Sequence, residues 1–181
     1  MYRPDNIVRD KILNLRKGSI FFPSDFDEVA TPEAIRQTLS RMVKQGEILR
    51  VSRGVYCTPK SNKALGLDVI PPSAEEIAQR IAERDRIKII PTGDYALNRL
   101  GLSTQVPVNA VYITNGARKK IKLANGSSII FRESNEFRLF EFSSGVMMLV
   151  VSAMRSIGEN NITTETIAKI KEILASVPDD L

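Results

Sequence analysis

Apolar residues near the start of the chain recur at i, i+4 and i+7, which predicts an amphipathic helix over residues 5–17 capped by Asp5. The apolar stripe of this helix consists of Val8, Ile12 and Leu15. A short apolar run ending in proline predicts a strand over residues 19–23, and the polar start of the next segment predicts a brief helix over residues 24–29.

The clearest helix start comes next. Thr31-Pro32-Glu33 combines a capping hydroxyl, a proline at the first helical position and an acid at the positive end of the helix dipole. We expect this helix to run to about Gln45 and to end at Gly46. Its apolar face carries Ile35, Leu39, Met42 and Val43. Its opposite face carries Arg36, Gln37, Ser40, Arg41 and Lys44.

Alternating residues then predict a hairpin, with strands over 48–52 and 55–57 and a turn at Arg53-Gly54. Helix, strand, helix, basic helix and hairpin is the order of a winged helix-turn-helix, which we assign to residues 1–60. In that fold the third helix enters the major groove and the hairpin, or wing, lies against the DNA backbone.

A polar stretch and a Pro-Pro pair interrupt the periodicity, and we interpret residues 61–72 as a linker. Residues 73–181 then form a second, mixed α/β domain. Its first half is predicted to hold a helix over 73–85, a strand over 87–91 and a helix over 95–100.

Three alternating runs follow, over residues 110–114, 119–123 and 128–132, and Asn-Gly pairs separate them. Because Asn-Gly favours two-residue hairpins, we expect a small antiparallel meander. Two helices, over 145–156 and 163–175, close the domain. The predicted fold class is therefore α+β.

Charge is distributed unevenly along the 181 residues. The chain carries a net charge of +5 and has a pI near 9.4. Residues 1–60 hold 11 Lys and Arg against 7 Asp and Glu, whereas residues 61–181 hold 15 against 14. The basic excess therefore lies in the predicted winged helix, which favours a polyanionic partner.

Several kinds of chemistry lack the residues they need. The chain has no histidine and one cysteine, Cys57, which excludes a Ser-His-Asp triad, a disulfide and a Cys-rich zinc site. We interpret Cys57 as a packed residue, and we find no phosphate-binding glycine loop. The sequence thus predicts a non-enzymatic protein with no catalytic residues, metal or cofactor.

The longest apolar run, residues 146–151, is too short to span a bilayer, and the N-terminus lacks the apolar core of a signal peptide. We therefore expect a cytoplasmic protein without membrane contact.

The predicted partner is double-stranded DNA. Arg and Gln can read base edges in the major groove, and Ser and Lys can hold phosphates. The candidate DNA-binding residues are Arg36, Gln37, Ser40, Arg41, Lys44, Arg50, Ser52 and Arg53. For the helix alone, a solvated face is the competing interpretation.

A second basic cluster is formed by Arg118, Lys119, Lys120 and Lys122. Charged residues on an edge strand also prevent aggregation, and this is one interpretation of the cluster. The others are a second nucleic-acid surface and a docking patch for an acidic partner.

Two stretches resemble AbiEi-type antitoxins, the autoregulators of a class of bacterial toxin–antitoxin systems. Residues 41–56 (RMVKQGEILRVSRGVY) resemble the end of the recognition helix and the wing of that family. Residues 91–102 (PTGDYALNRLGL), continuing to 105–107, are similar to the start of its C-terminal domain. With the order of elements, the resemblance covers roughly residues 5–175.

The resemblance implies that the N-terminal winged helix binds inverted repeats in its own promoter and represses transcription. It also implies that the C-terminal domain neutralises a nucleotidyltransferase-like toxin encoded beside it. Two alternatives stay open: a winged-helix regulator whose C-terminal domain senses a ligand or dimerises, and a module that docks a protein. The sequence leaves the operator and the oligomeric state open.

Overall fold

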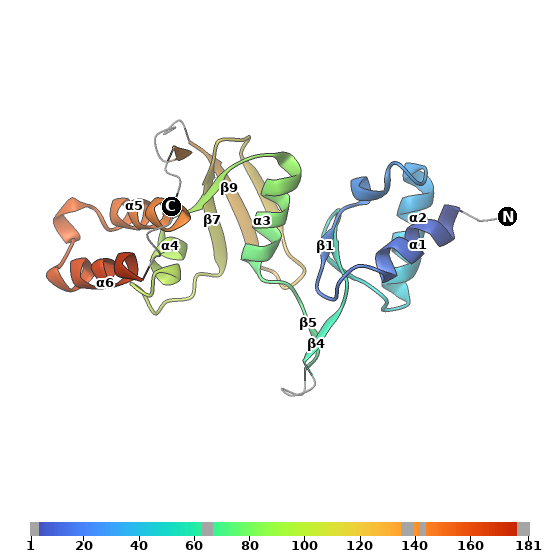
Figure 1. The fold of residues 1–181 in the computed structure, drawn as a ribbon, viewed down its shortest axis with the longest axis horizontal. Helices are drawn as coiled ribbons and strands as arrows, with labels where there is room; N and C mark the ends of the chain where they lie inside the picture. The colour runs from blue at the N-terminus through green and yellow to red at the C-terminus, as the bar shows by residue number, and fades with distance from the viewer. Residues whose placement is uncertain (1–3, 63–66, 135–139, 142–143, 177–181) are drawn as a thin grey trace. The chain divides into compact units, whose positions relative to one another are not determined.

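The computed structural model describes residues 4–62, 67–134, 140–141 and 144–176, excepting the side chains of 4–6, 62 and 67–68. The described chain is a mixed α+β protein (Figure 1). It divides into two compact units, Met1–Arg80 with Lys122–Gly126, and Ile81–Ile121 with Ser127–Leu181. The division falls at Arg80, inside the helix that follows the predicted linker.

The first unit contains α1 (Pro4–Leu13), the 3-10 helix η1 (Pro23–Phe26) and α2 (Pro32–Lys44). The prediction for α2 is confirmed within one residue at its end, but α1 ends at Leu13, four residues before the predicted end at residue 17. Asp5, the predicted N-cap, lies inside α1, which begins at Pro4. The side chain of Asp5 falls outside the described residues.

The early end of α1 has a tertiary cause. Thr58 Oγ1 donates to the Arg16 carbonyl oxygen at 2.7 Å, and the Gly18 N–H donates to the Thr58 carbonyl oxygen at 3.1 Å. These bonds hold residues 16–18 in a turn, which Gly18 permits with its φ of +84°. The sequence pattern cannot reveal them because Thr58 is 42 residues from Arg16.

A three-stranded antiparallel sheet of order β1-β3-β2 completes the core of the first unit. Its strands are β1 (Ile20–Phe21), β2 (Leu49–Ser52) and β3 (Val55–Cys57), so the predicted hairpin is confirmed. The helices and the sheet enclose one apolar cluster. Its buried members are Val8, Ile12, Phe21, Phe26, Ile35, Leu39, Met42 and Ile48.

Arg80 lies in α3 (Ala74–Asp85), in the part of the helix that belongs to the first unit, and contacts residues of this unit. Its Nε donates to the Ile20 carbonyl oxygen at 3.3 Å, and its guanidinium lies 5.5 Å from the centroid of the Phe22 ring. It also pairs with Asp25 at 3.4 Å. Residues up to Arg80 therefore belong to the first unit.

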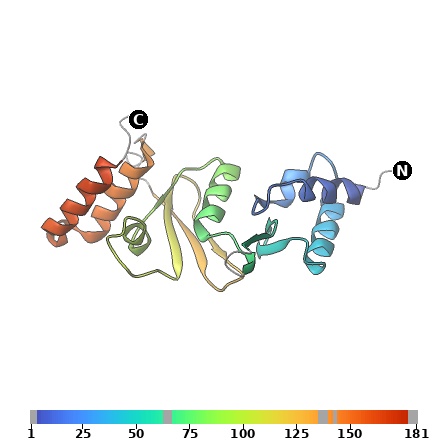
Figure 2. The same ribbon diagram turned by 60° about the horizontal axis from the view of Figure 1, so that its bottom comes forward.

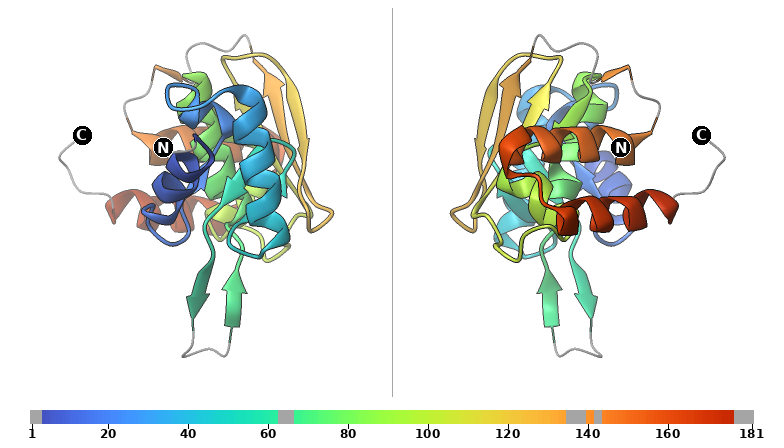
Figure 3. Two further views of the ribbon diagram at one scale, coloured as in Figure 1. Left: turned by 90° about the vertical axis from the view of Figure 1, so that its right-hand side faces the viewer. Right: turned by 90° about the vertical axis from the view of Figure 1, so that its left-hand side faces the viewer.

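The predicted linker contains a β-ladder. Strands β4 (Lys60–Asn62) and β5 (Leu67–Ile70) pair antiparallel as a separate two-stranded sheet. Figure 3 shows this ribbon extending away from the helices of the first unit. The polar residues Lys60–Asn62 thus form one strand of this ladder.

The second unit is built on a four-stranded sheet of order β6-β7-β9-β8. Its strands are β6 (Ile89–Pro91), β7 (Asn109–Thr114), β8 (Lys119–Lys122) and β9 (Ser128–Glu133). β7 pairs parallel with β9, and β6 pairs antiparallel with β7. The strand positions were predicted correctly, but the antiparallel meander was wrong.

The backbone conformation of Asn115-Gly116 explains why the predicted meander was wrong. A type I′ hairpin turn needs positive φ at both residues, yet neither has it, whereas Gly126, between β8 and β9, has a φ of +89°. Instead, Asn115 Oδ1 accepts a hydrogen bond from Lys88 N at 2.8 Å. A Cβ placed at Gly116 would lie 2.6 Å from Ile87 Cγ2, so glycine is needed here for close packing.

Helices α4 (Asp94–Arg99), α5 (Gly145–Ile157) and α6 (Thr164–Ala175) also belong to this unit, and Figure 2 shows α5 and α6 side by side. They agree with the predicted segments. Ser144 and Thr163 cap α5 and α6. The short 3-10 helix η4 (Glu159–Asn161) connects those two helices. Ile90 on β6 packs with Met148 and Val151 of α5, and α4 packs on α5 through Ala96 and Leu149.

Candidate nucleic-acid interface

One face of α2 is fixed against the core of the first unit. The Thr31 hydroxyl oxygen accepts a hydrogen bond from Ala34 N at 3.4 Å and so caps the helix, which begins at Pro32 as predicted. The buried residues of the helix are Ile35, Thr38, Leu39 and Met42. Burial of this stripe determines which side chains point outward.

The five candidate residues of α2 all lie on the outward side. They are exposed and share the face opposite the buried stripe (α2 in Figure 1): Arg36, Gln37, Ser40, Arg41 and Lys44. The structure thus brings together the three cations, the amide and the hydroxyl that the helical spacing had grouped. We call this set the α2 outer face.

One acid, Glu33, also lies on the α2 outer face, at its N-terminal end. It forms an ion pair with Arg36, and Gln37 Nε2 donates to its Oε1 at 3.0 Å. The hydrogen bonds from Arg36 and Gln37 lower the pKa of the Glu33 carboxyl. Because exposed pairs of this kind are weak, a phosphate can compete for Arg36. In the sequence, Glu33 is recognisable only as a helix-start signal.

Toward the C-terminal end of α2, the face is basic. Arg41 and Lys44 occupy the last turn, where cations also complement the helix dipole. The helix ends when Gly46 adopts a φ of +72°, and Glu47 beyond it pairs with Arg9 of α1. The Arg9 guanidinium lowers the pKa of Glu47, so this acid is engaged within the fold.

The β2–β3 hairpin contributes two further exposed cations, Arg50 and Arg53. Gly54, with a φ of +73°, forms the turn between the strands. Ser52 does not join them, contrary to the prediction. Its side chain is buried, and its hydroxyl donates to the Lys122 carbonyl oxygen at 2.8 Å. The alternation that placed Ser52 outward fails because of the register shift between Arg50 and Ser52.

The second basic cluster lies on β8 and the residue before it. Arg118, Lys119, Lys120 and Lys122 are all exposed, as expected for an edge strand. The first three line a pocket of about 430 Å³. Its other lining residues are Ile130, Phe131 and Arg132. Lys122 is not among them.

Sequence reasoning missed Arg132, because it lies on another strand and is isolated in the sequence. The available signal was alternation, since Arg132 follows a strand run in which Ile129 and Phe131 are buried. Only strand pairing shows that this outward position lies beside β8.

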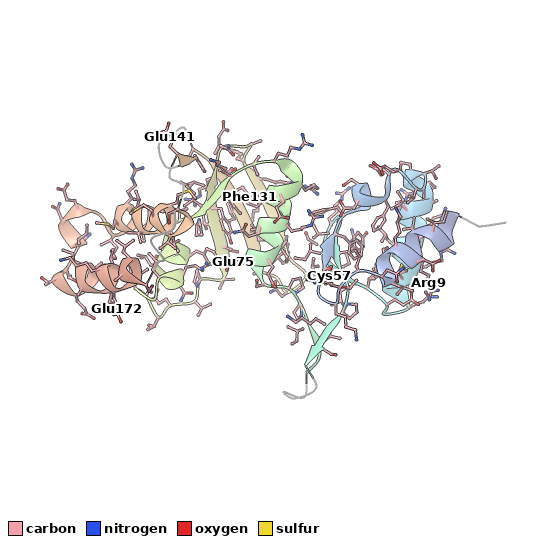
Figure 4. All side chains as sticks on the ribbon, viewed as in Figure 1. Arg9, Cys57, Glu75, Phe131, Glu141 and Glu172 are labelled. Carbon is pink, nitrogen blue, oxygen red and sulfur yellow. The ribbon has the colours of Figure 1, made fainter. Side chains whose placement is uncertain are left out.

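Cys57 is confirmed as a packed residue (Figure 4). Its side chain is fully buried on the central strand β3, and burial, with a smaller contribution from the Glu76 carboxylate, raises the pKa of its thiol to about 11. A thiol held in its neutral form is a poor nucleophile and a poor metal ligand.

Among the residues that the structure describes, no helix has the length and apolar character needed to cross a membrane. Comparison with curated proteins found no match. A model of a family of unknown function, DUF6088, matches residues 7–180, which is nearly the whole chain. The protein therefore belongs to the DUF6088 family.

Proposed function

We propose that residues 1–60 form a winged helix-turn-helix that binds duplex DNA, with α2 as the recognition helix and the β2–β3 hairpin as the wing. The observation that carries the proposal is the exposed α2 outer face, on which Gln37, Ser40, Arg41 and Lys44 share one side of a helix fixed by its buried stripe. These side chains match the donors and acceptors of base edges and phosphates.

In this mechanism phosphate neutralisation supplies most of the affinity, and the amide and hydroxyl supply the base-edge contacts that set register. Arg50 and Arg53 contact the backbone from the wing. Ser52 has no part in the interface, since its hydroxyl is bonded to Lys122. The mechanism requires no cofactor and no catalytic step.

The test measures binding of the full chain to the DNA upstream of its own gene, by fluorescence anisotropy at several salt concentrations. Arg41→Ala combined with Arg53→Ala removes one cation from the helix and one from the wing. We expect affinity to fall at least tenfold and the slope of log K against log salt to fall by about 1.8, or 0.9 per lost phosphate contact.

The matched control is Lys169→Ala with Lys171→Ala, which removes two exposed lysines of α6. This variant has the same net charge as the test variant and should keep wild-type affinity. If both variants bind alike, the α2 outer face is not the DNA-binding surface.

We further propose that the protein acts in the cytoplasm as an autoregulator and antitoxin, and that its second unit neutralises a nucleotidyltransferase-like toxin. The support is the resemblance of residues 91–102 to the AbiEi-type C-terminal domain. Co-expression with the product of the adjacent gene tests it: a toxic neighbour should be rescued by the full chain. A harmless or unrescued neighbour would leave a regulator whose second unit senses a ligand or dimerises.

A further inference from the structure

The pocket beside β8 gathers positive charge from two neighbouring strands. We call it the basic pocket, and its volume is about 430 Å³. Its four cations are Arg118, Lys119, Lys120 and Arg132. Phe131, labelled in Figure 4, precedes Arg132 on β9. A volume of this size falls within the range of small-ligand pockets.

Strand alternation explains why two of these charges, Lys120 and Arg132, converge. Ile121 is buried on β8, so Lys120 beside it points to the opposite side of the strand. On β9 the buried residue is Phe131, and Arg132 points outward in the same way. Since β8 and β9 are adjacent, Lys120 and Arg132 come together in one hollow.

Little negative charge compensates this group. Lys119 lies 3.5 Å from Asp85, a carboxylate that is closer to Arg84, at 2.7 Å. Arg118, Lys120 and Arg132 form no ion pair with any residue that the structure describes. Like charges in one pocket repel each other, and a bound polyanion would relieve that repulsion.

The lining also indicates which anion fits. Arginine holds phosphate through two parallel N–H donors, and lysine holds it as a point charge. Two arginines and two lysines can match several linked phosphates. A single carboxylate needs fewer donors than these four side chains offer. Phe131 is only 2% exposed, so its ring offers no surface for stacking a base.

We propose that the basic pocket binds linked phosphate groups, either of a free polyphosphate such as a nucleoside triphosphate or of a nucleic-acid backbone. This site lies in the second unit and does not depend on the proposal for α2. The basic pocket recognises the charge and spacing of the phosphates and does not distinguish one base from another.

The experiment uses the full chain and sodium tripolyphosphate as the probe, with binding measured by isothermal titration calorimetry at low salt. Lys120→Ala with Arg132→Ala removes one cation from each strand, and both residues are exposed, so the fold should persist. We expect tripolyphosphate affinity to fall at least tenfold. The Lys169→Ala and Lys171→Ala control should bind as the wild type does. Circular dichroism melting checks that the variants are folded.

Equal binding of tripolyphosphate by the wild type and the Lys120/Arg132 variant would overturn the proposal. So would tighter binding of poly-L-glutamate than of tripolyphosphate, because the pocket would then fit an acidic protein. Competition separates the two phosphate sources: displacement by ATP alone supports a free polyphosphate, and displacement by unrelated duplex DNA supports a backbone. The Arg41→Ala, Arg53→Ala variant should retain tripolyphosphate binding, which distinguishes failure here from failure of the α2 proposal.

Discussion

The hydroxyl of Ser52 donates a hydrogen bond to the carbonyl oxygen of Lys122 at 2.8 Å, across 70 residues of sequence. Next to it, the Ala124 N–H donates to the Val51 carbonyl oxygen at 2.9 Å. Through these two bonds, residues 122–126 extend the edge of β2 and belong to the first unit. A serine that seemed suited to DNA contact is therefore part of the internal structure of this unit.

Ser52→Ala should destabilise the protein by about 1 kcal/mol, because it removes a buried hydrogen bond and leaves the Lys122 carbonyl without that donor. The free energy of unfolding in urea measures the effect. Ser24→Ala, at an exposed serine of η1, is the control and should change stability little. A loss that is equal in both variants would contradict a structural role for the Ser52 hydroxyl.

Gly116→Ala should cost roughly 1–3 kcal/mol, because the new Cβ would lie 2.6 Å from Ile87 Cγ2 and force the Ile87 side chain to shift. Gly145→Ala is the matched control, since the space around Gly145 is open. Thermal melting compares the two. Ile87→Ala in the Gly116→Ala background should recover part of the loss, and an absence of any recovery would argue against the steric explanation.

The thiol of Cys57 should react very slowly with DTNB at pH 8 in the folded protein and rapidly in urea, because burial favours its neutral form. Burial raises the pKa of the Cys57 thiol from the ordinary value of 9.0 to about 11 in the fold. Its contribution to stability is therefore complete below pH 9 and is lost as the pH rises from 9 to 11, where the unfolded chain releases the proton first.

Cys57→Ala isolates this effect from other groups that titrate at high pH. Unfolding free energies measured from pH 8 to 11 should fall less steeply for the variant than for the wild type. Parallel curves would show that the thiol ionises equally in the folded and unfolded chains.

Glu33→Gln should tighten duplex DNA binding roughly two- to fivefold at low salt, because it removes the one negative charge on the α2 outer face and releases Arg36 from its ion pair. The gain should shrink as salt increases. Glu165→Gln on α6, whose carboxylate pairs with Lys169 at 3.2 Å, is the control. A gain of the same size in both variants would indicate a net-charge effect unrelated to α2.

Local signals predicted the helix ends well where the caps are local. Thr31 caps α2 through Ala34, and Ser73 and Glu76 form a capping box at α3, in which the Ser73 N–H donates to Glu76 Oε2 at 2.7 Å. All of these partners lie within three residues of each other, so a sequence pattern contains them. The α2 outer face followed from helical periodicity for the same reason.

The sequence by itself determined the elements, the burial stripe of α2 and the exclusion of histidine and disulfide chemistry, because these depend on residue type and on spacing of a few positions. Only the tertiary structure decided the parallel pairing of β7 with β9, the burial of Ser52 and the convergence of Lys120 with Arg132. Each of these depends on strand pairing or hydrogen bonds between segments distant in sequence, and the packing energy of the whole unit selects such pairings.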